Sequence, residues 1–400
     1  MAYLLEDIRV IDAASFLAGP GAATVMADFG ADVIKIEPPN GDGYRALVGN
    51  YPVGYHWQLT SRNKRSLALD LTNEDGQALL HKLVEDADVI LTNFLDDQLQ
   101  RFQMTYEQLK GINPRIIFAQ LTGYGMQGPE VARKAFDITA WWARSGMMDF
   151  VRDSGQTPLA AAPGMGDHST AMSMYGAIMT GLFRRERTGV GCHVSTSLVA
   201  NGVWANGMAL QGVIAGLDLG AYKQAKGWFS PFTSTYPTRD DRYVVLAIIN
   251  TSREWPQLAK ALDHPEWTED QRFSDMRVLM KNRRELIALI SVETVKYAQD
   301  ELMRVFDEHD ITCGVVAPMG DVVNDAQLIA NDVIIPTNDP GDDYRWTINS
   351  PIFVAEESKR PPSRAPGVGD HSVEVLQEAG YSEEEIRRLL ERGIVTGPEN

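Results

Sequence analysis

The sequence is poor in cysteine and contains no long hydrophobic run. Its two cysteines, Cys192 and Cys313, lie far apart and lack the paired spacing of a metal site or a redox motif. No stretch approaches the ~18 apolar residues of a membrane span. Acidic residues come early in the N-terminal segment, where a signal peptide is basic. We therefore expect no metal site, no membrane insertion and a cytoplasmic location.

Basic residues are also few, with 37 Lys and Arg against 54 Asp and Glu and a net charge of −17. This balance argues against nucleic acid as a partner, because backbone phosphates require a broad basic surface. Binding of an anionic cofactor is still compatible with this charge if cations cluster at one site. Arg62, Lys64 and Arg65 form one such cluster, which is either a phosphate site or a solvated loop.

The apolar runs of the first half predict alternating strands and helices. Strands are expected at residues 8–12, 33–36, 66–71, 88–92, 115–121 and 193–197, and helices up to residue 29, at 74–85 and at 169–186. Such alternation is typical of βαβ units with a parallel sheet. The predicted fold class is α/β, with a Rossmann-like, doubly wound large domain and a smaller α+β domain.

Two irregular stretches divide the chain, which is too long for one ordinary core. We expect residues 1–215 to form the N-terminal part of the large domain, 216–241 a linker, 242–325 the small domain, 326–364 a return linker, and 365–400 helices that rejoin the large domain. The small domain is expected to begin with a strand at 243–249, followed by two or three helices.

A glycine pair after the first strand suggests a dinucleotide fingerprint. Gly19 and Gly21 follow that strand, and Glu37 ends the second one. However, the third glycine of the fingerprint would fall at Thr24, and Pro20 separates the first two. The motif therefore argues against a nicotinamide cofactor.

A second glycine segment, Gly164-Met-Gly-Asp-His-Ser169, places one acidic residue before a long predicted helix. Asp167 has two interpretations. It can be a helix N-cap, because Asp is a preferred capping residue. Alternatively, amides at the helix start can hold its carboxylate as an anion that attacks a thioester.

Several motifs together resemble the class III CoA-transferases, also known as the formyl-CoA transferase and carnitine CoA-transferase family, over essentially the whole chain. The motifs are LAGP at 17–20, FGADVIKIE at 29–37, NKRS at 63–66, NF at 93–94, NPR at 113–115, GYG at 123–125, GD at 166–167, TGVG at 188–191 and APGVGDH at 365–371. Each motif alone is weak, but their shared order and spacing are specific.

This resemblance implies a nucleophile, a cofactor site and an assembly. Asp167 matches the family's nucleophile, which forms acyl anhydrides and an aspartyl-CoA thioester, and Asp137 lies near the reaction centre. By position, the coenzyme A contacts are Ala18, Leu69, Asn93, Phe94, Arg101 and Lys134. Without the resemblance, Asn93 and Phe94 read as a strand end and a core aromatic, and the two cations as solvated charges. The family also implies a homodimer in which each chain encircles the other through its two linkers.

Departures from the family's pattern bear on the substrate. Formyl-CoA transferases carry a glutamine in place of Leu17, an arginine in place of Pro38, and a glycine-rich loop that is not found in this sequence. These departures argue against small dicarboxylates such as oxalate. The motifs GYG at 123–125, FDITA at 136–140 and GDH at 166–168 resemble members that act on 2-hydroxy and aryl acids such as phenyllactate, which implies a bulky, aryl or 2-hydroxy acceptor. Phe16, Trp141, Trp142, Met147 and Met148 would form an apolar pocket, or alternatively plain helix core.

Two other functions remain open. The related α-methylacyl-CoA racemases exchange an α-proton with a histidine and an aspartate, but Phe136 occupies the histidine position here. His168 follows the nucleophile and belongs to a different element. A non-catalytic CoA-binding protein is the third possibility. Exchange of CoA onto a labelled acid distinguishes a transferase from both.

Overall fold

The fold was analysed in a computed structural model of the 400-residue chain, which describes residues 3–48, 51, 54–220, 230–339, 341 and 343–398. Residues 221–229 of the expected first linker, and 340 and 342 of the return linker, lie outside the described residues. The chain divides into two compact units. Residues 1–152, 156–212 and 329–400 form the first, and residues 153–155 and 213–328 form the second. Within the described part of the chain, no helix is long and apolar enough to cross a membrane.

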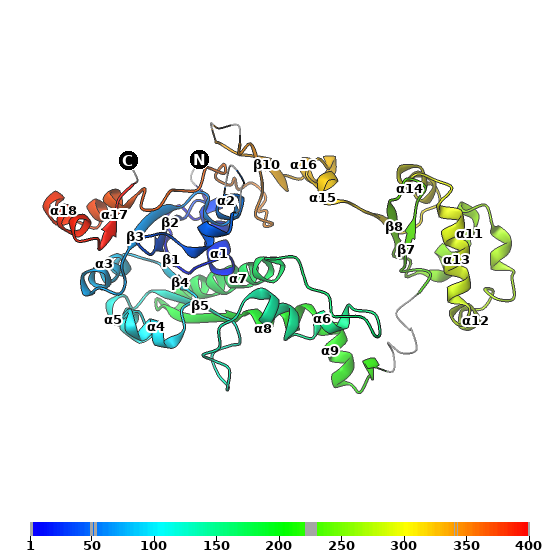
Figure 1. Cartoon of the computed structure of the whole chain (residues 1–400), viewed down its shortest axis with the longest axis horizontal. Coiled ribbons are helices and arrows are strands. Elements are labelled where there is room, and N and C mark those ends of the chain that lie inside the picture. The colour runs from blue at the N-terminus through cyan, green and yellow to red at the C-terminus, as the bar shows by residue number, and fades with distance from the viewer. Residues whose placement is uncertain are drawn as a thin grey trace. The chain divides into compact units, whose positions relative to one another are not determined.

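The first unit is built on a seven-stranded sheet (Figure 1). In spatial order its strands are β12 (Val395–Thr396), β3 (Arg65–Leu69), β2 (Asp32–Glu37), β1 (Arg9–Ala13), β4 (Val89–Thr92), β5 (Ile117–Thr122) and β6 (Cys192–Ser197). All neighbours pair in parallel except β12, which runs antiparallel to β3. The strand order 3-2-1-4-5-6 is that of doubly wound folds, in which ligands bind beyond the carboxyl ends of the strands where the order reverses. Here the reversal lies between β1 and β4.

Helices cover both faces of this sheet. One face carries α3 (Glu74–Glu85), α4 (Asp96–Arg101), α5 (Tyr106–Ile112), α17 (Ser372–Glu378) and α18 (Glu383–Glu391). The other carries α1 (Ala18–Asp28), the π-helix η2 (Ile138–Ala143), α7 (Met165–Thr188) and α8 (Leu198–Ala205). The shorter elements are η1 (Gly43–Val48), α2 (Tyr55–Ser61), α6 (Met147–Phe150), α9 (Gly207–Ile214), α16 (Ala326–Ala330), β10 (Ile334–Pro336) and β11 (Trp346–Ile348).

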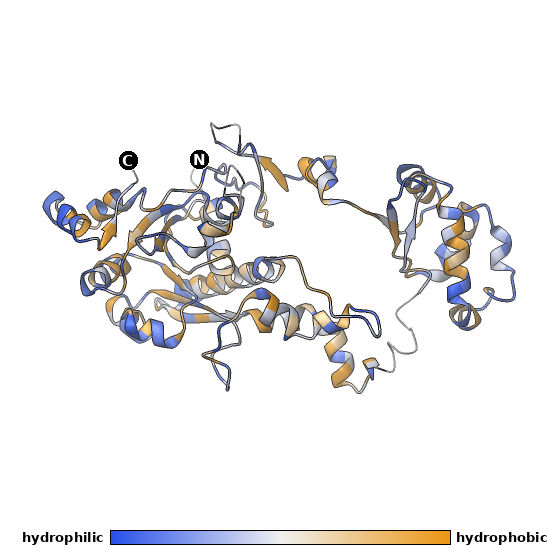
Figure 2. Ribbon diagram, viewed as in Figure 1, coloured by the Kyte–Doolittle hydropathy of each residue, from blue (hydrophilic) through white to orange (hydrophobic). Residues whose placement is uncertain are grey.

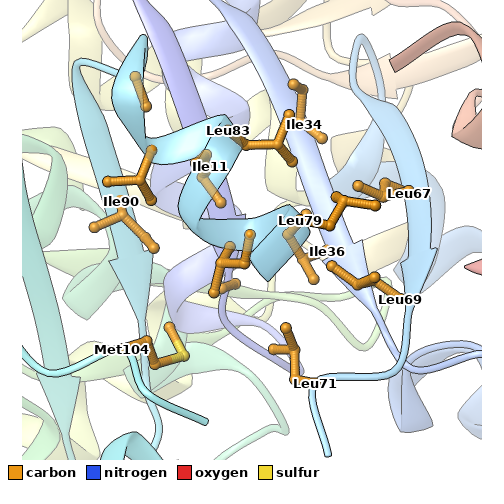
Figure 3. Close-up of a cluster of buried hydrophobic side chains, with 14 of the residues drawn as sticks. Ile11, Ile34, Ile36, Leu67, Leu69, Leu71, Leu79, Leu83, Ile90 and Met104 are labelled. Atoms are coloured by element: carbon orange, nitrogen blue, oxygen red, sulfur yellow. The ribbon is translucent and has the colours of Figure 1, made fainter. Parts of the chain in front are cut away.

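Alternation along the strands explains the two layers. In β1, Val10 packs into the α1 and α7 layer, whereas Ile11 packs into the α3 layer. Figure 3 shows Leu79 and Leu83 of α3 against Ile11 and Ile34. Because both faces are covered, the central strands β1, β2, β4 and β5 are largely buried on both sides. Figure 2 shows mostly hydrophobic strands and a largely hydrophilic α18.

The second unit has its own core. A three-stranded antiparallel sheet consists of β7 (Thr235–Pro237), β8 (Tyr243–Leu246) and β9 (Cys313–Val316). Its helices are α11 (Thr251–Ala261), η3 (Pro265–Thr268), α12 (Met276–Lys281), α13 (Arg283–Thr294), α14 (Gln299–Glu308) and α15 (Met319–Val322). The core cluster joins residues of the sheet to α11, α13 and α14.

The cation cluster at residues 62–65 is neither a solvated loop nor a free phosphate site. Lys64 is completely buried and lies 2.8 Å from Asp12, with the backbone oxygens of Pro20 and Thr60 as further acceptors. Arg62 is buried against Asp28 at 2.7 Å. Both cations therefore form ion pairs within the fold, since a buried charge requires a partner.

Arg65, the third member of the cluster, forms ion pairs with Asp32 (2.8 Å), Glu374 (2.9 Å) and Glu378 (2.8 Å). Through these pairs it ties β3 to β2 and to α17. All three cations are therefore structural.

Candidate active site

The first turn of α7 carries Asp167, and two glycines shape its position. Gly164 is the N-cap of the helix and has φ +83°, a left-handed conformation that favours glycine. A Cβ atom on Gly166 would lie 2.6 Å from the side chain of Trp141. Glycine at 166 thus allows the helix start to press against the core, with Asp167 as the third helical residue rather than the N-cap.

Asp137 holds the same loop from the other side. It directly precedes η2, and its Oδ2 accepts a hydrogen bond of 2.8 Å from the backbone N–H of Gly164. Within the residues that the structure describes, no hydrogen-bond donor engages the carboxylate of Asp167. One carboxylate therefore positions the loop, while the second remains available for reaction.

Burial and charge tune this pair. The pKa of Asp167 is raised to about 7, first by burial and then by the nearby charge of Asp137. A carboxylate of higher pKa is a stronger nucleophile once ionised. The pKa of Tyr44 rises to about 12, first through burial and then through the charges of Asp167, Tyr55, Asp42 and Asp137. The Tyr44 phenol therefore lies close to both carboxylates and stays protonated at neutral pH.

A cavity of about 210 Å³ opens at the carboxyl ends of β1 to β4, where the strand order reverses. Its lining residues are Ala13, Ser15, Ile36, Glu37, Pro38, Pro39, Leu69, Asp70, Leu71, Thr72, Phe94, Gln98 and Phe102. Two of the predicted coenzyme A contacts, Leu69 and Phe94, are among them. The location is the one that doubly wound folds use for ligands.

The other predicted contacts surround this cavity or lie on the surface. Asn93 exchanges two hydrogen bonds with Ser15: its Oδ1 accepts from the backbone N–H at 3.0 Å, and its Nδ2 donates to the backbone oxygen at 2.9 Å. Ala18 begins α1 and is buried. Arg101 ends α4 and is exposed, as is Lys134. Within the described part of the chain neither cation forms an ion pair, so both are free to meet phosphates.

The predicted apolar pocket divides into two parts. Trp141 and Trp142 are buried in the core of the α1 and α7 layer, with parallel rings 5.8 Å apart, and Met147 and Met148 pack against that core. This location corresponds to the core alternative for the tryptophans. Phe16, in contrast, is 36% exposed.

Sequence reasoning missed the segment GDGYR at residues 41–45. Asp42 and Tyr44 are buried there, and Arg45 forms an ion pair of 2.7 Å with Glu37. Burial is the largest single effect and opposes ionisation of Glu37, but the Arg45 guanidinium, the Ser66 hydroxyl and the Asp42 amide together lower the pKa of Glu37. The available signal was the run of two glycines, an acid and an aromatic residue immediately after β2.

Comparison with known proteins agrees with this geometry. The family model described as CoA-transferase family III matches residues 5–372. A cinnamoyl-CoA:phenyllactate CoA-transferase of Clostridium sporogenes is 30% identical, covering 96% of each chain. An (R)-2-hydroxy-4-methylpentanoate CoA-transferase of Clostridioides difficile is 29% identical over 98% of this chain and 99% of its own. A CAIB/BAIF family protein from Brucella suis has a TM-score of 0.82 at 26% identity and covers 95% of this chain and 100% of its own. The chain therefore belongs to CoA-transferase family III and is an enzyme of that class.

Proposed function

We propose that the enzyme moves CoA from an acyl-CoA donor to a free carboxylic acid with Asp167 as the nucleophile. The observation that carries this proposal is the carboxylate of Asp167 in a glycine loop at the start of α7, which no hydrogen-bond donor among the described residues engages. The ionised carboxylate attacks the thioester carbonyl, the C–S bond breaks, and an acyl-aspartyl anhydride and CoA thiolate form. The thiolate then attacks the Asp167 carbonyl, which releases the donor acid and leaves an aspartyl-CoA thioester.

The second half repeats these steps in reverse. The acceptor carboxylate attacks the thioester and forms a second anhydride, and the thiolate then attacks the acceptor's carbonyl to yield the new acyl-CoA. The first amides of α7 lack intrahelical partners, so they can stabilise the oxyanion of each addition. Such stabilisation commonly contributes about 3–4 kcal/mol. The tethered anhydride also keeps the reactants together.

The CoA site that we propose is the cavity at the ends of β1 to β4. Leu69 and Phe94 line it, and Asn93 holds the Ser15 backbone at its edge. Ala18 contributes a buried backbone position at the start of α1. Arg101 and Lys134 would meet CoA phosphates, because neither forms an ion pair with a described residue and the protein is otherwise acidic.

The acceptor that we propose is a bulky, aryl or 2-hydroxy acid. Leu17 is buried against Tyr44 and Trp57, so the site offers an apolar side chain where formyl-CoA transferases have an amide. Two of the similar enzymes are named for phenyllactate and for a branched 2-hydroxy acid. Both observations favour an apolar group on the acceptor over a small dicarboxylate.

Incubation with an acyl-CoA and a labelled free acid tests this function. Transfer of the label into a CoA thioester supports it. Loss of an α-deuterium without transfer would indicate a racemase instead. His168 lines a separate cavity of about 450 Å³ together with Thr24, Met172 and Phe353, and Phe136 offers no base beside Asp137.

The pH dependence follows from the pKa of Asp167, which is raised to about 7. Only the ionised carboxylate attacks, so we expect kcat/KM to rise with pH until about 7 and then to level off. Asp137→Asn removes the second charge but keeps an acceptor for Gly164. It should lower the pKa of Asp167 and move the acid limb to lower pH. A pH profile of both enzymes measures this, and a limb that stays in place or moves upward contradicts the charge coupling.

We also propose that two copies form an interlocked dimer through linkers at residues 216–241 and 326–364. Trp204 of α8 and Met208 of α9 are 86% and 94% exposed, and Figure 2 shows α9 as mostly hydrophobic. Exposed apolar surface of this kind is typical of an obligate interface. Sedimentation at micromolar concentration should detect a dimer, whereas a stable folded monomer contradicts the proposal.

A further inference from the structure

Three aromatic rings form a continuous row beside the two carboxylates. The rings of Tyr44 and Phe16 lie 6.1 Å apart, and those of Phe16 and Phe136 meet edge to face at 5.5 Å. Phe136 directly precedes Asp137, which bonds to Gly164 in the loop of Asp167. The row therefore runs from η1 to the loop that carries the nucleophile.

The other end of the row contacts the same loop. Tyr44 packs with Leu17 in a small buried cluster, and a Cβ atom on Gly164 would lie 3.0 Å from Cδ1 of Leu17. Both ends of the row thus meet the segment in which Asp167 begins its helix.

A buried ion pair fixes the row in place. Asp42 and Lys35 have completely buried side chains 3.1 Å apart. Oδ1 of Asp42 accepts from the backbone N–H of Tyr44 at 2.9 Å and lies 3.5 Å from the backbone nitrogen of Phe16. From the other side, Lys35 donates to the backbone oxygen of Ala14. One carboxylate thereby sets the backbone beneath two of the rings.

The backbone of Phe16 shows that this placement is enforced. Its φ is +64°, an uncommon conformation for a residue with a bulky side chain, and it persists only where the surroundings determine it. Asp42 on one side and the Asn93 bonds to Ser15 on the other supply that constraint. The ring is consequently held outward, 36% exposed, instead of folding into the core.

Phe16 and Phe136 are 36% and 56% exposed, and Phe136 directly precedes Asp137, which bonds to the loop of Asp167. The rigid faces of the two rings fit a flat or branched apolar group. Binding of this group is favoured by its removal from water and by its contacts with the rings. The cavity that we propose for coenzyme A includes Ser15, one residue before Phe16. The row therefore begins beside this cavity and leads to Phe136, which directly precedes Asp137.

We infer that Phe16 and Phe136, backed by the buried ring of Tyr44, form an aromatic wall against which the apolar group of the substrate acid lies, and that this wall sets the preference for aryl over short-chain acids. The inference rests on the proposed CoA transfer. The buried Asp42 is a positioning residue that acts through the backbones of Tyr44 and Phe16.

Phe136→Ala and Phe16→Ala test the wall, because truncation of an exposed ring leaves the core intact. For an aryl acid, kcat/KM should fall about 10- to 100-fold, the loss that a buried aromatic contact supports. For a short-chain acid such as acetate, kcat/KM should stay within about threefold, since a methyl group is too small to need the wall. Tyr44→Phe keeps the ring and should preserve the ratio between the two acids.

Phe183→Ala is the matched control, because it also removes an exposed ring. Phe183 is 63% exposed and lies on α7, outside the aromatic row. Equal losses for both acids in the Phe136 and Phe16 variants, or an unchanged ratio, would overturn the wall while CoA transfer itself persists. A drop in aryl-acid preference caused by Tyr44→Phe would overturn the role of its ring as an apolar support behind Phe16. Absence of transfer in the unmodified enzyme with every acid would instead refute the proposed function.

Discussion

Asp167→Ala should lose CoA transfer by roughly 10⁴- to 10⁶-fold, the range found when the nucleophile of a covalent mechanism is removed. The cause is that no other carboxylate in this site can form the tethered anhydride. Asp137 is held by the Gly164 amide, and its position before η2 lacks the glycine neighbours that let a thioester approach. Steady-state assays with saturating donor and acceptor measure the loss.

The Asp167→Ala variant should still bind CoA with near-normal affinity, because Arg101, Lys134 and the cavity at the ends of β1 to β4 remain. Glu186→Ala is a matched control, since Glu186 is an exposed acid near the other end of the same helix. Near-normal turnover of the Asp167 variant would contradict the mechanism. Equal loss in the Glu186 variant would show that the effect comes from α7 as a whole.

Lys64→Met should lower the free energy of unfolding by about 3–5 kcal/mol, the effect of breaking a buried ion pair by removing one partner. Asp12 would be left as an unpaired buried charge, and the oxygens of Pro20 and Thr60 would lose their shared donor. Urea denaturation at one fixed protein concentration measures the change, since the proposed dimer would couple stability to concentration.

Two further variants serve as controls for Lys64→Met. Lys82→Met removes a cation from an exposed pair with Glu85 and should have a much smaller effect. Lys64→Met combined with Asp12→Leu removes both buried charges and should recover much of the loss. If Lys64→Met is as stable as Lys82→Met, the buried pair does not hold β1 to α2 as the contacts indicate.

Periodicity predicted the regular elements well where local signals were strong. Helix α3 begins and ends at the predicted residues 74 and 85, because Asn73 caps it and leucines repeat along its buried face. The parallel sheet agrees with the predicted alternation of strands and helices. The start of α7 was missed by four residues, since glycines in its first turn conceal a helix whose cap is the left-handed Gly164.

Contacts between distant segments were beyond reach of the sequence patterns. Lys64 and Arg62 looked like candidates for an anion site because their partners, Asp12 and Asp28, come from other elements. The aromatic row was hidden for the same reason. Its three rings are separated by up to 120 residues and meet only through the Asp42 contacts and the Asp137 loop.

The most direct test of covalent catalysis by Asp167 is to trap the intermediate. The enzyme is mixed with acyl-CoA, treated with hydroxylamine, digested with trypsin and mapped by mass spectrometry. The account predicts a hydroxamate at Asp167 in the peptide of residues 153–184, dependent on acyl-CoA and absent from Asp167→Ala. Asp137 lies in a different peptide, residues 135–144, so the two carboxylates are distinguished. A label at Asp137, or none at either aspartate during active turnover, contradicts the account.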